Sequence, residues 1–305
     1  MSPPLRVQPV DAGRSGKVSE YHVAFARLGP LISLRTFLQG GAWWRLVVDP
    51  KTLKTSVVAD VGAVSLALDQ VEPSPWTEGL AEARQHDASL QDSGLTHLLP
   101  SQTGFVLTVD LCPSRKHFDF DLVHQLIAAV ESSERPIPVA FAISGVWLQE
   151  HPDDLAQLQK LDGTDLAITW INHSMHHRYS PTRPLTQNFL LEPGTNMPSE
   201  VLDTEVVMLE AGLMPSVFFR FPGLISEPSL VEFVTSFGLI PVGSDAWLAK
   251  GERAGRGSIV LVHGNGNEPQ GVKDFYALLK REGKAIAQHQ FMLLDLREAV
   301  SVGLP

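Results

Sequence analysis

The sequence predicts an α/β barrel of about seven strand–helix units, preceded by a small β-rich cap. From about residue 101 onward, short apolar runs alternate with longer amphipathic segments, as expected where each strand is followed by a helix. The runs are continuously apolar, which is typical of parallel strands buried on both faces. We therefore predict a barrel over residues 101–305.

The predicted strands are seven short runs. They cover residues 105–110, 137–143, 165–171, 216–221, 238–243, 258–263 and 291–296. The clearest helical segments between them are residues 120–133, 199–212 and 271–288, where the apolar spacing favours amphipathic helices.

The first hundred residues have a different pattern, and we interpret residues 1–100 as the cap. "YHVAFARL" and "AWWRLVVDPKTLKTSVVADV" are typical of strands, the second forming a hairpin that turns at Asp-Pro-Lys-Thr, residues 49–52. A linker and a helix are expected in residues 71–97. Trp43, Trp44 and Trp76 could stack on sugar rings, but we expect them to pack the cap against the barrel.

Composition excludes several classes of protein. The formal net charge of −10 argues against a nucleic-acid partner, and the single cysteine, Cys112, excludes an internal disulfide. No apolar run approaches the ~18 residues of a transmembrane helix. The first twenty residues lack the apolar core of a signal peptide, as expected for a cytoplasmic protein or for a chain whose signal has been removed.

The stretch "NHSMHH", residues 172–177, follows an apolar run. His173 and His177 are four residues apart, with His176 beside them, so both imidazoles could reach one divalent ion. A solvated surface pair is the alternative.

Polar residues gather at the predicted strand ends, where barrel enzymes carry their catalytic groups. They are Asp110 in "TVDLCPS", Arg220 in "FRFPG", Asp245 and Trp247 in "GSDAW", and His263 in "LVHGNGNEP". Ionisable groups at buried strand ends are costly unless paired, so packing alone explains them poorly.

These motifs resemble those of the polysaccharide deacetylases, the nodulation-type carbohydrate esterases. "TVDLCPS" is similar to the family's T-F-D-D-G-P-[ST], "HSMHH" to H-[ST]-x-x-H-P, "RFPG" to R-x-P-[YF]-G, "SDAW" to an Asp-Trp motif and "LVH" to L-x-H. All five occur in family order across residues 101–300. The resemblance does not cover the cap.

The resemblance implies a deformed (β/α)7 barrel that hydrolyses the N-acetyl amide of a sugar with the help of a divalent ion. If the roles of the family's motif residues apply to the matching positions here, Asp110 would be the general base and His263 the general acid. His173 and His177 would bind the metal.

The remaining matched residues would support these groups. Arg220 would pair with Asp110, and Asp245 would orient His263. Trp247 would form a wall of the site, Ser174 would stabilise the turn, and Pro222 would shape its loop.

Three positions depart from the family pattern. Leu111 replaces the carboxylate ligand, Cys112 replaces the following glycine, and Arg178 replaces the proline after the second histidine. Two imidazoles make a poor zinc site, so Asp110 or His176 would have to complete it. Otherwise the site is metal-free and its histidines bind substrate. Leu111→Asp should then raise zinc affinity.

Cys112 could be a nucleophile, but no motif activates it, and we interpret it as a small buried thiol. The sequence thus predicts a hydrolase of a C–N amide bond, acting on an N-acetylated saccharide with a weak divalent site, zinc being expected. The rivals are a metal-independent hydrolase of a small amide and a catalytically weak carbohydrate-binding protein. The resemblance suggests a location outside the cytoplasm.

Overall fold

The computed structural model describes residues 16–85, 90–99 and 101–304. Residues 1–15, which make up most of the segment predicted to lack a signal-peptide core, lie outside the described residues. So does residue 100, at which the boundary between cap and barrel was placed, and that division stays a prediction. No helix in the described ranges is long and apolar enough to cross a membrane.

The larger sheet is parallel and has the order β10-β9-β8-β7-β6-β12-β11, with β13 beside β6. Its strands are β6 (Gly104–Leu111), β7 (Ile137–Ile143), β8 (Leu166–Asn172), β9 (Pro215–Phe219), β10 (Ile240–Pro241), β11 (Ala246–Trp247), β12 (Ile259–His263) and β13 (Met292–Leu293). Each predicted run overlaps one of them; β11 was not predicted. The α/β class is confirmed.

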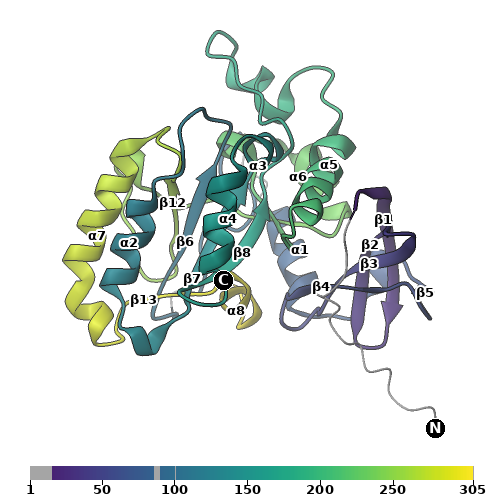
Figure 1. The fold of residues 1–305 in the computed structure, drawn as a ribbon, viewed down its shortest axis with the longest axis horizontal. Coiled ribbons are helices and arrows are strands. Elements are labelled where there is room, and N and C mark those ends of the chain that lie inside the picture. Colours follow the sequence, from purple (N-terminus) through teal and green to yellow (C-terminus); the bar gives the residue numbers. More distant parts are fainter. Residues whose placement is uncertain (1–15, 86–89, 100, 305) are drawn as a thin grey trace.

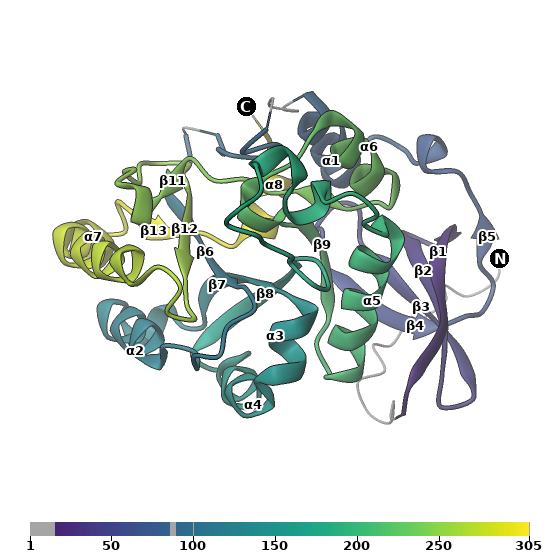
Figure 2. The ribbon, with the colours of Figure 1, turned by 90° about the horizontal axis from the view of Figure 1, so that it is seen from above.

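Helices surround the curled sheet, with α7, α2, α4 and α5 spaced around its outside (Figures 1 and 2). The helices are α1 (Pro75–Gln85), α2 (Phe120–Ala129), α3 (Gly145–Glu150), α4 (Pro152–Leu161), α5 (Met197–Glu210), α6 (Pro228–Ser236), α7 (Pro269–Ala287) and α8 (Leu296–Ser301). The 3-10 helices are η1 (Leu68–Gln70), η2 (Ser132–Glu134), η3 (Leu185–Gln187), η4 (Phe189–Leu191), η5 (Pro222–Leu224) and η6 (Leu248–Lys250).

The barrel is incomplete, because the hydrogen-bonded path of strands ends at β10 and β11. Residues 90–99 run beside this open edge. The backbone N–H of Leu95 donates to Pro241 (2.9 Å), and that of Gly243 donates back to Leu95 (2.8 Å). The N–H of Leu98 donates to Gly257 (2.8 Å). The expected deformed barrel is therefore confirmed.

The N-terminal sheet is antiparallel, in the order β4-β3-β2-β1-β5. Its strands are β1 (Val18–Leu28), β2 (Leu31–Gln39), β3 (Ala42–Val48), β4 (Thr55–Ala59) and β5 (Val64–Ser65). The predicted hairpin is confirmed, since Asp49 N–H donates to Lys54 O (2.9 Å) and Leu53 N–H to Asp49 O (2.8 Å).

The cap packs against the flank of the barrel beside α5 (Figure 1). Trp76 is fully buried and its indole N–H donates to Gly238 O (3.1 Å). Trp44 packs in an apolar cluster that includes Leu209 of α5. These two tryptophans hold the cap and barrel together as expected, but Trp43 is 45% exposed, so that expectation is wrong for Trp43.

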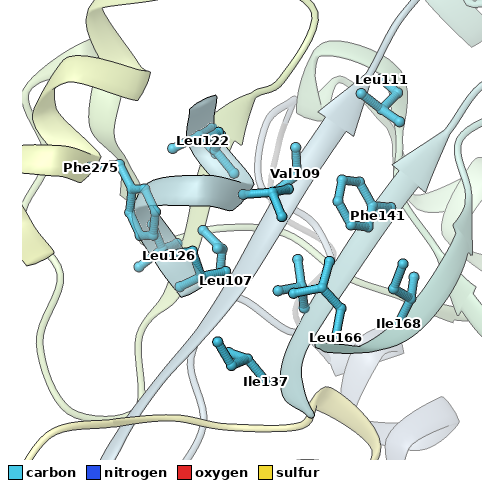
Figure 3. Packing of buried hydrophobic residues seen from close by; sticks show 14 of the residues in the cluster. Leu107, Val109, Leu111, Leu122, Leu126, Ile137, Phe141, Leu166, Ile168 and Phe275 are labelled. Carbon is cyan, nitrogen blue, oxygen red and sulfur yellow. The ribbon is translucent and has the colours of Figure 1, made fainter. Parts of the chain in front are cut away.

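Alternation along β6 sends Leu111 away from the barrel mouth. Leu107, Val109 and Leu111 pack in one fully buried cluster with side chains of α2 and α7 such as Leu122 and Phe275 (Figure 3). Successive side chains of a strand face opposite sides, so Leu111 points into the helix layer. This packing argues against the expectation that an aspartate at this position would complete the metal site, and that expectation stays a prediction.

Leu111→Asp is instead expected to lower the free energy of unfolding by at least about 2–5 kcal/mol, because it removes a buried leucine side chain and leaves a carboxyl group without partners in an apolar layer. Chemical denaturation measures this. Leu111→Met, which conserves volume, should cost less than about 1.5 kcal/mol. Unchanged stability of the Asp variant, together with tighter zinc binding, would show that residue 111 reaches the site.

Candidate active site

The site lies where β6, β8, β9 and β12 end. Asp110 and His263 are register partners on the neighbouring strands β6 and β12, so their side chains face the same side of the sheet about 5 Å apart at the backbone. His173 follows the end of β8 and Arg220 the end of β9. Strand ends predicted from the sequence thus meet at one edge.

A pocket of about 800 Å³ opens beside His263. It is lined by Gln91, Cys112, Pro113, His176, His177, Arg178, Tyr179, Leu185, Phe189, Gly223, Ile225, Trp247, Lys250, His263, Asn267 and Glu268. Gly223 beside the predicted Pro222 has φ +61°, and a Cβ there would lie 2.5 Å from the Phe189 ring. Pro222 itself begins η5 and is buried.

Asp110 is 3% exposed and lies between the Arg220 guanidinium and the His173 imidazole. Its Oδ1 lies 3.8 Å from Nη1 of Arg220, and its Oδ2 lies 3.7 Å from Nε2 of His173. Arg220 is anchored by a hydrogen bond from Nη2 to Thr108 Oγ1 (2.9 Å). Asp110 Oδ1 has no hydrogen-bond partner among the described residues, so it can accept a proton.

The surroundings of His173 fix its tautomer. Its Nδ1 lies 2.8 Å from the carbonyl oxygen of Arg220, which can only accept, so Nδ1 carries the hydrogen. Nε2 therefore presents a lone pair, the arrangement that metal-binding histidines adopt. Burial lowers the pKa of His173 to about 4, against the opposing effect of Asp110, which keeps the ring neutral at neutral pH.

The turn after β8 presents His177 to the same point. Ser174 (φ +66°) and His177 (φ +47°) both have left-handed backbone conformations. The turn is tied by hydrogen bonds from Ser174 N–H to Asn172 Oδ1 (3.0 Å) and from His177 N–H to Ser174 Oγ (3.2 Å). The two imidazole centroids are 4.7 Å apart, and His177 Nε2 is buried without a hydrogen-bond partner.

Cys112 joins the two imidazoles. Its Sγ lies 3.6 Å from Nε2 of His173, and one donor atom from each of Cys112, His173 and His177 lies within 4.8 Å of the others. This set of donors, two imidazole nitrogens and a sulfur, fits a divalent transition ion. Burial alone would raise the pKa of Cys112, but His177 and His263 outweigh it and lower that pKa to about 7.

Two proposed ligands lie outside this group in the described chain. Of the two histidines, Asp110 approaches His173. It does not belong to the group of Cys112, His173 and His177 donors that lie close to one another. His176 turns to Glu200, whose Oε1 lies 2.8 Å from its Nδ1.

Asp245 does not meet His263, and the prediction that it orients this histidine is wrong. Its Oδ1 accepts the N–H of Ile259 (2.9 Å) and its Oδ2 lies 2.6 Å from Nδ1 of His97. Ile259 begins β12 and His263 ends it, which separates them by about 13 Å. Asp245 lies in the link between β10 and β11, directly before β11 begins.

Glu268, which the sequence analysis missed, takes that position. Its Oε2 lies 2.9 Å from His263 Nδ1 and accepts the indole N–H of Trp247 (2.6 Å). Burial alone would lower the pKa of His263, but Cys112, Glu268 and Asp110 raise it well above its ordinary value. The sequence feature that could have indicated this role is an acidic residue five positions after His263, in the loop before α7.

Trp247 forms a wall of the pocket, as expected. The ammonium group of Lys250 lies 3.6 Å from the centroid of its indole ring, a cation–π contact, and the ring centroid is 6.0 Å from that of His263. No described cap residue from 16–85 lines the pocket, so Trp43, Trp44 and Trp76 do not contribute to it.

Glu268→Gln is expected to lower the hydrolytic rate about 10–100-fold, since contacts to charged groups contribute roughly 1.5–3 kcal/mol. Loss of this carboxylate also lowers the pKa of His263, so activity at the alkaline side should be lost at lower pH than in the wild type. A pH–rate profile measures both effects.

Glu252→Gln is the matched control. Glu252 Oε2 accepts the backbone N–H of Trp247 (2.6 Å), and a glutamine oxygen can still accept it. An alkaline limb that moves equally in both variants, or in neither, would contradict the pairing of Glu268 with His263.

A search against models of known protein families finds no match. The solved structures to which this chain is similar include carbohydrate esterases. A family 4 carbohydrate esterase from Bacillus anthracis aligns with 75% of this chain and 93% of its own, at 14% identity and a TM-score of 0.51.

Two further structures give lower scores. A peptidoglycan N-acetylglucosamine deacetylase aligns over 67% of this chain and 91% of its own, at 14% identity and a TM-score of 0.49. A family 4 pseudoenzyme from Bacillus anthracis aligns over 67% of this chain and 68% of its own, at 11% identity and a TM-score of 0.48. The esterase with a TM-score of 0.51 confirms, for the fold, the resemblance noted in the sequence.

Proposed function

We propose that this chain hydrolyses the amide bond of an N-acetylated saccharide, releasing acetate and a free amine. The observation that carries the proposal is the placement of Asp110 and His263 as register partners beside the imidazoles of His173 and His177. A base, an acid and a pair of nitrogen donors at one pocket are the groups that amide hydrolysis requires. The shared fold of a family 4 carbohydrate esterase agrees with it.

In this mechanism Asp110 takes a proton from water, and the water oxygen attacks the acetyl carbonyl carbon. Arg220, whose Nη1 lies 3.8 Å from Asp110 Oδ1, orients this carboxylate through its charge. A divalent ion bound at His173 and His177 would supply Lewis acidity towards the carbonyl oxygen.

Collapse of the tetrahedral species breaks the C–N bond. The amine nitrogen is a poor leaving group unless it is protonated, and His263 donates that proton. The raised pKa of His263 keeps it in the acid form at neutral pH. Glu268 Oε2 lies 2.9 Å from its Nδ1, and we assign the donated proton to Nε2.

The pocket supports a saccharide as substrate. Its volume of about 800 Å³ is within the range of ligand sites. Tyr179, 60% exposed, is stacked on Phe189 at its rim, where an aromatic face can cover a sugar ring. Hydrogen-bonding groups such as Gln91, Arg178 and Asn267 lie around it.

The test is acetate release from oligomers of N-acetylglucosamine, from the monomer and from a small acetamide, each with added zinc. We expect the oligomers to react fastest, because they fill more of the pocket. Release from the small acetamide alone would favour a different substrate class, and no release from any of them would contradict the proposal.

A further inference from the structure

The carboxylate that the family supplies to its metal has no equivalent at residue 111, but the next residue faces the mouth. Leu111 is fully buried in the helix-side cluster, and Cys112 lines the pocket. The chain therefore presents a sulfur atom, rather than a carboxylate oxygen, from the end of β6.

The spacing of the donors suits one tetrahedral ion. With metal–sulfur and metal–nitrogen bonds of about 2.3 and 2.0–2.1 Å, two ligand atoms of a tetrahedron lie about 3.5 Å apart. Cys112 Sγ and His173 Nε2 are 3.6 Å apart, and a donor atom of His177 lies within 4.8 Å of both.

The nitrogen lone pairs at this point have no strong partner: His173 Nε2 meets only the Cys112 sulfur, at 3.6 Å. His173 Nε2 is left as an acceptor by the contact of Nδ1 with Arg220 O, and His173 is fully buried. His177 Nε2 is buried without a hydrogen-bond partner. Buried polar atoms are rarely left unpaired, and an ion between them would satisfy both.

We propose that Cys112, His173 and His177 form a thiolate–bis-imidazole centre for a soft divalent ion such as Zn²⁺, with the fourth position open to the pocket. A thiolate favours zinc over magnesium, calcium or manganese. This ligand set leaves Asp110 free to act as the base. The inference deepens the proposed function, but its test measures metal binding without substrate, so the two can fail separately.

The test is the absorption spectrum of the full chain titrated with Co²⁺. A cobalt–thiolate bond gives an intense charge-transfer band in the near ultraviolet. Cys112 is the single cysteine of the chain, so this band can come from no other residue. A second group of possible donors, His117, His151 and Asp154, contains no sulfur and would add no such band.

We expect the band in the wild type, its loss in Cys112→Ser, and visible cobalt bands without the sulfur band in Cys112→Asp. Zinc competition against a chromophoric chelator should show binding to Cys112→Ser weakened by more than the ~10–100-fold cost of losing an outer partner. Cobalt bound to the wild type without the band, no cobalt binding, or equal zinc affinity of the serine variant would each overturn the inference.

Discussion

Asp110→Asn is expected to lower the rate of amide hydrolysis by about 10²–10⁴-fold, the usual contribution of a general base. Asparagine has nearly the shape of aspartate, so the packing beside Arg220 and His173 should persist. Its amide cannot take a proton from water. We therefore expect kcat to fall with little change in KM, measured by steady-state acetate release.

Asp245→Asn is the matched control, because it makes the same chemical change at the other end of β12, beside Ile259. Its rate should stay close to that of the wild type. If Asp245→Asn lost as much activity as Asp110→Asn, or if Asp110→Asn were fully active, the assignment of the base would be wrong.

Glu205→Gln is expected to lower the free energy of unfolding by about 3–5 kcal/mol, since it removes one partner of a buried ion pair. Arg35 of the cap is fully buried, and its guanidinium binds both carboxylate oxygens of Glu205 on α5, at 2.7 and 3.0 Å. The Tyr21 hydroxyl also donates to Glu205 (2.8 Å). A neutral amide would leave the Arg35 charge unpaired.

Chemical denaturation measures this loss. Glu192→Gln is the control, because Glu192 pairs with the more exposed Arg178 and Arg183, where such pairs contribute about 0–1 kcal/mol. A double variant with apolar residues at positions 35 and 205 should recover part of the loss. Equal small effects of Glu205→Gln and Glu192→Gln would show that the cap is not held by this pair.

The sequence predicted the barrel well because buried parallel strands are continuously apolar. It missed β2, whose middle carries Arg35 between Leu34 and Thr36; that arginine is buried only because Glu205, distant in the chain, pairs with it. It also missed β11, since a strand of two residues has no periodicity to detect.

The residues of the candidate site were predicted from the same apolar runs that predicted the strands. Asp110, His173, Arg220 and His263 were found because each stands at or just after the end of an apolar run. Asp245 was misplaced because β11 was missed. Cys112 acquires its role from a contact across the chain, with His173. Glu268 lies only five residues after His263, but in a loop, where no periodicity predicts the direction of its side chain.

The central claim is that Asp110 and His263 hydrolyse an N-acetyl amide. The most direct measurement counts acetate and new primary amine released from an N-acetylglucosamine oligomer by the zinc-loaded wild type and by Asp110→Asn. We predict equal amounts of both products from the wild type and a rate at least ~10²-fold lower from the variant. Absence of both products from the wild type, or equal rates from the two proteins, would contradict the claim.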